Sequence, residues 1–259
     1  MLSLKEIEKQ YPEALRPFKS FILREYLQHK ILEIIYNSDF ANQLVFMGGT
    51  ALRIVHNNTR FSEDLDFDNR GLSENDFKAV SKHIETELEK EGYQIEMKNV
   101  MKGAFHCHIR FPGLLFKEGL TGHKEQKILI QLDTEPQHFD YNPDMIILNR
   151  FDVFTEIFVT PLPILLSQKL YAILNRKQPK GRDFFDTIFL LAQIKPDYRY
   201  IEQKTGIKNA DNLRMAILKK CQEIDMPLMV KDVQEFLFNS RDTKKILLFE
   251  KYFGQANIG

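Results

Sequence analysis

The sequence contains no tryptophan and only two cysteines, Cys107 and Cys221. Two thiols are too few for a disulfide framework or for a zinc site built from thiolates. They suit a reducing compartment, and we interpret both as structural. The shortage of cysteine therefore excludes the small disulfide-stabilised secreted domains and the thiolate metal proteins.

An excess of charge of either sign is also missing, because 36 basic residues balance 36 acidic ones. A nucleic acid or phosphate partner must therefore be bound by a local patch and not by the field of the whole surface. No stretch of about eighteen uncharged apolar residues occurs, and charges stand in the N-terminal segment where a signal peptide needs an apolar core. We expect a soluble, cytoplasmic protein.

The composition that remains is globular, and 259 residues leave room for one large domain or two modest ones. Hydrophobic periodicity predicts helices at 16–36, after the glycines at 48–49, and at 73–92, with strands at 44–47, around 65–67, and at 93–100, 104–111 and 127–134. Beyond residue 161 the pattern favours helices alone, at 164–175, 184–193, 209–224 and 230–237. We therefore predict an α+β fold with two lobes, 1–160 with a small mixed sheet flanked by helices and 161–259 all helical.

Two carboxylates alternate in the run 60–67, Arg-Phe-Ser-Glu-Asp-Leu-Asp-Phe. On a strand, residues i and i+2 point to the same face, so Asp64 and Asp66 are expected to project together. Such a pair can hold two metal ions that clamp the attacking and leaving oxygens of a phosphoryl transfer. Magnesium prefers oxygen ligands, so the lack of histidine in this run favours it.

A third carboxylate, Asp133, stands at the end of the apolar run 128–132. A carboxylate that ends a buried strand is costly unless a metal or a cation compensates it. We therefore predict that Asp133 lies on a strand beside Asp64 and Asp66 and completes the metal site.

Gly48, Gly49 and Thr50 stand between a predicted strand and a short helix. Glycines let the backbone approach a ligand closely, and free N–H groups at a helix start can bind phosphate. A tight turn, with Thr50 as an ordinary helix N-cap, explains an isolated Gly-Gly-Thr better. The order of strand, Gly-Gly-Thr, helix and Asp-Leu-Asp favours a triphosphate site instead.

This constellation resembles the DNA polymerase β-like nucleotidyltransferases, in which a glycine turn precedes an Asp-x-Asp strand. More narrowly, it is similar to the AbiEii/AbiGii-type toxin nucleotidyltransferases of type IV toxin–antitoxin and phage-defence systems. The resemblance rests on 46–53 (Phe-Met-Gly-Gly-Thr-Ala-Leu-Arg), on 60–67, and on 182–186 (Arg-Asp-Phe-Phe-Asp), and extends to 24–27 and loosely to 225–227.

The resemblance implies a transfer of a nucleoside monophosphate from an NTP to an acceptor hydroxyl, with two Mg²⁺ ions, an RNA acceptor such as a tRNA 3′ end, and a separately encoded antitoxin. It implies metal ligands at Asp64, Asp66 and Asp133, and further catalytic roles for Lys169 and Asp183, brought to a cleft by the helical lobe. Nucleotide or phosphate contacts are expected from Gly48, Gly49, Thr50, Arg53, Arg60, Ser62, Lys169, Arg176 and Arg182. The roles of Asp183 and Asp186 stay open between holding Lys169 or Arg182 in place and contacting the acceptor or base.

Two further motifs favour ordinary structural roles. Glu63 and Asp68 are expected to be exposed acids at the strand ends, with Asp68 capping a turn. His106 and His108 share one strand face, but without a nearby soft ligand we interpret them as structural and not as a metal site.

Two other functions fit the same residues. One is nucleotidyl transfer to a small molecule, as in the related aminoglycoside-modifying enzymes, and the other is a module that binds nucleotide without turnover. The clustered charges of the predicted site favour catalysis over a retired site.

Overall fold

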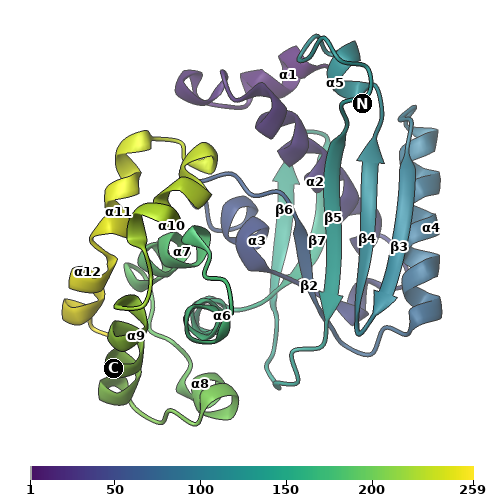
Figure 1. Cartoon of the computed structure of the whole chain (residues 1–259). Coiled ribbons are helices and arrows are strands. Elements are labelled where there is room, and N and C mark those ends of the chain that lie inside the picture. The colour runs from purple at the N-terminus through teal and green to yellow at the C-terminus, as the bar shows by residue number, and fades with distance from the viewer. Residues whose placement is uncertain (1) are drawn as a thin grey trace. The chain divides into compact units, whose positions relative to one another are not determined.

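The computed structural model describes residues 2–259 (Figure 1). By its internal contacts the chain divides into two compact units. The first unit runs through Val55 and includes Phe61–Val159, and the second consists of His56–Arg60 and Thr160–Gly259. The boundary predicted from the sequence lies after residue 160, and the short segment His56–Arg60 was predicted as part of the first lobe.

Within residues 2–259, the first unit holds one seven-stranded sheet in the order β3-β4-β5-β2-β1-β7-β6. Most neighbours are antiparallel, whereas β2 runs parallel to β5 and β1 runs parallel to β7. The strands are β1 (Leu44–Met47), β2 (Leu65–Asn69), β3 (Glu96–Lys102), β4 (Ala104–Phe111), β5 (Ile128–Glu135), β6 (Asp144–Arg150) and β7 (Val153–Val159). The sheet is mixed, as the sequence predicted.

Helices α2 and α4 pack on one face of the sheet, and Figure 1 shows α4 lying along β3 and β4. Ser73 begins α4 with a capping box, in which its side chain and that of Asp76 each bond the other residue's backbone N–H. Buried Phe77, Val80 and Ile84 then recur at helical spacing and face the sheet. The helices of this unit are α1 (Leu4–Lys9), α2 (Lys19–Tyr36), α3 (Gly48–Ile54), α4 (Glu74–Lys90) and α5 (Leu114–Lys117).

The hairpin of β6 and β7 was not predicted from the sequence. Its signal is present in β7, where Val153, Thr155, Ile157 and Val159 alternate as buried residues and are all β-branched. The opposite face carries Phe154, which is 67% exposed. Both faces are therefore partly apolar, and the usual alternation of apolar buried and polar exposed residues is weak. This hairpin extends the sheet beyond β1.

The second unit is helical in the residues that the structure describes, which agrees with the sequence prediction. Its helices are α6 (Leu162–Asn175), α7 (Gly181–Leu191), α8 (Tyr198–Thr205), α9 (Ala210–Cys221), α10 (Met226–Val233), α11 (Thr243–Leu247) and α12 (Phe249–Gln255). Helices α7 and α10 approach closely at Gly181, where an added Cβ would lie 1.9 Å from the carbonyl oxygen of Met229. Phe184, Phe249 and Phe253 pack together in the core of this unit.

Both cysteines are free and buried, and burial raises the pKa of the Cys107 thiol to about 11 and that of Cys221 to about 12. A thiol held in its neutral form is a poor nucleophile and metal ligand, which supports a structural role for both. Among residues 2–259, no helix has the length and apolar character needed to cross a membrane.

Candidate active site

Asp66 on β2 and Asp133 on β5 are direct partners in the parallel pairing of these strands. Partners on neighbouring strands lie about 4.8 Å apart and point to the same face. In both strands the alternate residues, such as Phe67 and Leu132, are buried on the opposite, helix-covered face. The structure therefore brings two of the three predicted metal ligands together on the open face of the sheet.

Asp133 is held by two side chains from the same face. The Nδ1 atom of His106, its register partner on β4, lies 2.6 Å from Asp133 Oδ1. Gln131 Nε2 lies 2.9 Å from both carboxylate oxygens. An ionised carboxylate has only acceptor atoms, so His106 Nδ1 and Gln131 Nε2 donate, and together they fix the orientation of Asp133.

Sequence reasoning missed His106, which it assigned to a structural strand face. In the sequence, His106 and His108 alternate with the apolar Cys107, and this pattern could have predicted that both histidines point to the open face. The pairing with Asp133 depends on the register of β4 against β5, which residues 27 positions apart do not reveal.

Gly48 follows β1 directly and faces the Asp66 carboxylate. Its φ is +78°, a left-handed conformation that side chains other than glycine adopt at a cost. A Cβ added there would lie 2.2 Å from Asp66 Oδ2. Two features therefore require glycine at position 48. One is the positive φ, and the other is the space that the Asp66 carboxylate occupies.

Asp64 lies one residue before β2, which starts at Leu65, so the sequence prediction that places it on the strand is wrong. Its segment is nevertheless fixed by two neighbouring helices. Gln28 Nε2 on α2 donates to the carbonyl oxygens of Ser62 at 3.0 Å and Glu63 at 2.9 Å. The hydroxyl of Thr50 on α3 donates to the carbonyl oxygen of Asp64.

This hydrogen bond also corrects the interpretation of Thr50 as an N-cap. Helix α3 has Met47 as its N-cap residue and no side-chain cap bond. Thr50 is fully buried and instead ties the glycine turn to the segment that carries Asp64.

Arg53 does not face open space at the predicted nucleotide site. Its Nε lies 2.7 Å from Glu25 Oε2, and Glu25 Oε1 also accepts hydrogen bonds from Arg150 and Tyr11, each at 2.8 Å. Burial alone would raise the pKa of Glu25, but Arg53 and Arg150 hold it below its ordinary value. Arg53 is 7% exposed and joins α2 to α3, so its guanidinium contacts Glu25 in place of the predicted phosphate.

Asp68 and Glu63 were both expected to be exposed. Asp68 is instead 3% exposed and accepts hydrogen bonds from the backbone N–H of Gln137 at 2.9 Å and the hydroxyl of Tyr141 at 2.8 Å. That prediction is wrong, because the chain after β5 folds back to satisfy the Asp68 carboxylate. Glu63 is partly exposed and forms an ion pair with Arg24.

In the second unit, two acids surround Lys169 on α6. Lys169 Nζ lies 3.2 Å from Asp183 Oδ1 and 2.9 Å from Asp186 Oδ2, both on α7. The three-residue spacing of these acids places them on one helical face, as expected. Within the unit, Asp183 and Asp186 therefore hold Lys169 in place.

Arg60 belongs to the second unit and is 2% exposed. Its Nε and Nη2 each lie 2.7 Å from the Asp186 carboxylate, and Asn58 Nδ2 donates to the same group at 2.8 Å. Burial would raise the pKa of Asp186, but Arg60 and Lys169 overcome it and hold the pKa well below its usual range. Arg60 therefore forms a buried ion pair with Asp186 in place of the predicted nucleotide contact.

The remaining basic residues of the prediction differ in exposure. Arg176 has a side chain that is 42% exposed, with Nε 3.2 Å from Asp183 Oδ2. Arg182 is half-buried at the second position of α7. Arg176 is thus the most accessible cation of this group and the one best placed to meet a ligand from solvent.

The donor set of Asp66 and Asp133 fits a hard divalent cation. Within residues 2–259, no three His, Cys, Asp or Glu side chains form a group that would hold a metal ion by themselves. Mg²⁺ is commonly bound by one or two carboxylates together with substrate phosphates and water, and not by an all-protein cage. Two side-by-side carboxylates next to a glycine turn meet that requirement.

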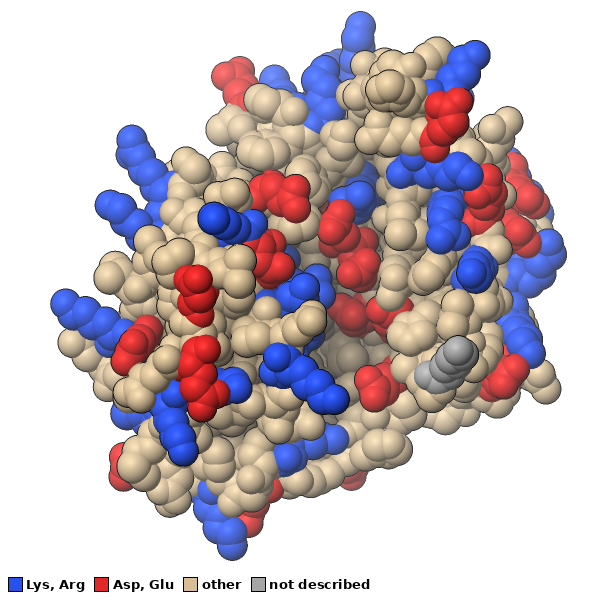
Figure 2. All heavy atoms as spheres, viewed as in Figure 1, with Lys and Arg blue, Asp and Glu red and all other residues tan. Residues whose placement is uncertain are grey.

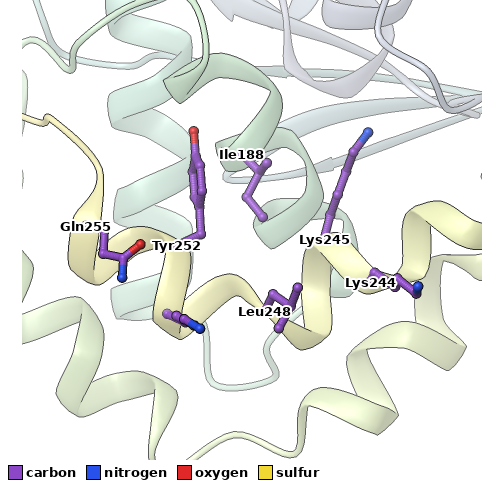
Figure 3. A pocket seen from close by; sticks show the side chains of 7 residues that line it. Ile188, Lys244, Lys245, Leu248, Tyr252 and Gln255 are labelled. Carbon is purple, nitrogen blue, oxygen red and sulfur yellow. The ribbon is translucent and has the colours of Figure 1, made fainter.

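A separate pocket of about 380 Å³ lies in the second unit, among α7, α11 and α12 (Figure 3). Tyr252 and Lys245 flank Ile188, and Lys244, Lys251, Leu248 and Gln255 complete the lining. The pocket contains none of the predicted site residues. Its lining combines the apolar side chains of Ile188 and Leu248 with three lysines.

Known proteins resemble this chain in sequence and in fold. A sequence model of a family described as nucleotidyl transferase AbiEii toxin, Type IV TA system, matches residues 30–251. The crystal structure of JHP933 from Helicobacter pylori has 15% identity and a TM-score of 0.55, with 91% of this chain and 92% of that chain covered. A second H. pylori structure, described as a putative nucleotidyltransferase, has 17% identity and a TM-score of 0.54, with 90% and 94% covered. No curated protein matches the sequence.

Proposed function

The chain belongs to the family of AbiEii nucleotidyltransferase toxins of type IV toxin–antitoxin systems, and we propose that it transfers a nucleoside monophosphate from an NTP to the terminal hydroxyl of an RNA such as a tRNA. We further propose that Mg²⁺ is its metal, that growth arrest by RNA modification is its role in the cytoplasm, and that an antitoxin encoded separately opposes it.

One observation carries the catalytic proposal: Asp66 and Asp133 are register partners on the open face of the sheet, and Gly48 stands against Asp66. Clustering acidic side chains on one face is unfavourable unless a cation joins them. Two neighbouring carboxylates and a turn without a side chain form a suitable place for a metal-bound triphosphate.

In the proposed reaction, the acceptor oxygen forms a bond to the α-phosphorus while the bond from that phosphorus to the bridging oxygen breaks, and pyrophosphate leaves with the electron pair. Asp133 accepts the proton of the acceptor hydroxyl at Oδ2, the oxygen that His106 does not contact and that Gln131 contacts at 2.9 Å. Asp64, Asp66 and Asp133 would hold the metal. Bound Mg²⁺ would supply neutralisation of the charge on the phosphates, and two such ions are proposed.

The turn Gly48–Gly49 holds the triphosphate through its backbone in this proposal, with Ser62 and Thr50 fixing the surrounding segments. For the second unit, we propose cationic contacts to phosphate from Arg176, Lys169 and Arg182. Asp183 contacts both the buried Lys169 and the partly exposed Arg176, and it positions both cations.

Incubation with radiolabelled NTPs and Mg²⁺ tests the function, with total RNA in one series and a panel of small hydroxylated compounds in another. We expect labelled RNA and Mg²⁺-dependent release of pyrophosphate. Asp66→Asn should abolish both while leaving the unfolding temperature within a few degrees of the wild type. Labelling confined to small compounds would refute the RNA acceptor, and a fully active Asp66→Asn enzyme would refute the site.

A cellular experiment connects the chemistry to toxicity. Mass spectrometry of RNA after induced expression should find an added nucleotide at RNA 3′ ends with the wild type and not with Asp66→Ala. Growth arrest that persists with Asp66→Ala would show that toxicity does not depend on transfer.

A further inference from the structure

The open face of β3 and β4 carries a row of polar and basic side chains that leads away from Asp133. On β4, Cys107 and Ile109 are fully buried on the helix-covered side, so His106, His108 and Arg110 point to the open side. Lys98 on β3 is the register partner of His108 and is exposed. Figure 2 shows blue basic side chains over β3 and β4 and red acidic ones over the middle of the sheet.

We propose that Lys98, His108 and Arg110 form a binding track for the phosphates of a single-stranded RNA acceptor, whose terminal hydroxyl lies at Asp133. This inference rests on the proposed function for the position of that hydroxyl. It adds a binding site on β3 and β4 and a direction for the acceptor strand.

The strand order separates the two substrates. Asp133 on β5 has β2 on one side, followed by β1 and the glycine turn at Gly48, and it has β4 and β3 on the other side. A triphosphate held at Gly48 and Asp66 occupies the β2 and β1 side. The acceptor must then approach Asp133 from β4 and β3, where the cations of the track lie.

The geometry of the track suits an extended polymer. His108 and Arg110 stand two and four residues from His106 along β4, which places the far end about 13 Å from the register partner of Asp133. Arg110 Nη2 lies 3.3 Å from His108 Nδ1, so the two side chains form one continuous polar edge. Leu129, the partner of Arg110 on β5, is 37% exposed and offers an apolar surface to a base.

The charge balance also favours an anionic polymer. Glu96 lies on the same face, but Lys127 Nζ is 2.7 Å from its carboxylate and compensates it. Lys98 and Arg110 therefore give the track a net positive charge, while the whole chain has none. A local patch of this kind is what a neutral protein needs to bind nucleic acid.

Fluorescence anisotropy of the full-length protein with a labelled ten-nucleotide single-stranded RNA measures the track directly, without NTP. The Lys98→Gln/Arg110→Gln variant is compared with Lys82→Gln/Lys90→Gln, which removes the same charge from α4 on the other face of the sheet. We expect at least tenfold weaker RNA binding at low salt for the first variant only. For this variant, the plot of log association constant against log salt concentration should be less steep by about 1.4, since each lost contact to a single strand contributes about 0.7.

Transfer kinetics then separate the track from the proposed function. With RNA as acceptor, the track variant should raise the KM for RNA about tenfold and leave the KM for NTP unchanged. Equal RNA binding by the track variant, the control and the wild type would overturn the track even if transfer is confirmed. RNA binding that the track variant weakens would support the track even if no transfer occurs.

An acidic protein segment is the competing occupant, and a poly-glutamate peptide serves as its probe. If the peptide bound the wild type and lost affinity with Lys98→Gln/Arg110→Gln, while RNA did not bind, the proposal would be overturned. His106 is left unchanged in all variants because it contacts Asp133 directly.

Discussion

His106 donates from Nδ1 to Asp133 Oδ1 over 2.6 Å, across the register pair that joins β4 to β5. The hydrogen bond makes the imidazole a positioning group for a carboxylate that neighbours Asp66. Outer partners of this kind restrict the orientations of a ligand without touching the reacting atoms. Removing this hydrogen bond should therefore affect the orientation of Asp133.

Replacing His106 by Phe should lower kcat about 10- to 100-fold, as is typical when a hydrogen-bonding partner of a metal ligand is removed. His106→Asn should retain most of the activity, because its side-chain amide can donate from a position near Nδ1. Steady-state kinetics should place the loss in kcat, with the KM for NTP unchanged. If Asn and Phe lowered kcat equally, the hydrogen bond would have no positioning role.

Gly48→Ala should damage both the fold and the activity. Its Cβ would meet Asp66 Oδ2 at 2.2 Å, and its φ of +78° adds a backbone cost. Gly119 is a matched control, because it has a φ of +69° and no described atom within 4 Å of an added Cβ. Gly119→Ala should cost about 1 kcal/mol of unfolding free energy and no activity, whereas Gly48→Ala should cost about 2 to 4 kcal/mol.

Chemical denaturation measures these two costs, and the transfer assay measures their effect on the site. Equal destabilisation by the two substitutions would show that the close approach of Gly48 to Asp66 has no energetic consequence.

The two acids of α7 should differ in their contribution to stability. Asp186 is fully buried and compensates Arg60 and Lys169, so Asp186→Asn leaves an uncompensated buried charge and should cost about 3 to 5 kcal/mol. Asp183 contacts the partly exposed Arg176, and Lys169 keeps its second partner when Asp183 is changed. Asp183→Asn should therefore cost about 1 kcal/mol, measured by urea unfolding.

The two variants are also compared in the transfer assay. We expect Asp183→Asn to raise the KM for NTP, because it releases Arg176 and removes one of the two carboxylates that hold Lys169. A larger loss of stability from Asp183→Asn than from Asp186→Asn would contradict the assignment of Asp186 as the buried anchor.

Local patterns predicted most of the fold. Residues 19–36 and 74–90 form helices because apolar side chains recur at helical spacing, and the Ser73 capping box marks where the second begins. The strand at 144–150 escaped prediction because Met145 and Ile147 are about 60% exposed, so its apolar residues do not mark a buried face. Its assignment depends on pairing with β7, which is a tertiary fact.

The candidate site was predictable in its residues and less so in their partners. The order of glycine turn and Asp-Leu-Asp predicted Gly48 and Asp66, since both follow from local spacing. The buried ion pairs of Arg53 with Glu25 and of Arg60 with Asp186 join residues 28 and 126 positions apart. A motif identifies an arginine as a candidate for a functional contact. Only the packed structure shows whether its guanidinium contacts a buried acid.

His29 gives the fold a specific sensitivity to acid. It is fully buried on α2, with Nδ1 2.7 Å from the carbonyl oxygen of Glu25, and the Arg53 and Arg150 cations and the Glu25 carboxylate lie around it. Burial lowers its pKa from the ordinary 6.5 to about 4, against the opposing effect of Glu25. The native state therefore favours the neutral imidazole more strongly than the unfolded chain does.

The sign of the pH dependence follows from this difference. Between pH 6.5 and pH 4 the unfolded chain binds a proton at His29 that the native state does not, so stability falls as the pH falls. At about 1.4 kcal/mol per pH unit, the loss from His29 over this window is about 3 kcal/mol. His29→Phe should remove most of that dependence, while His123→Gln, on an exposed loop, should leave it unchanged.

Urea unfolding of the three proteins at half-unit pH steps measures the effect as a difference, so that carboxylates titrating in the same range cancel. We expect the gap in unfolding free energy between His29→Phe and the wild type to shift in favour of the variant as the pH falls from 6.5 to 4. A gap that stays constant would show that His29 binds its proton equally in the folded and unfolded chains, and that burial on α2 does not control its charge.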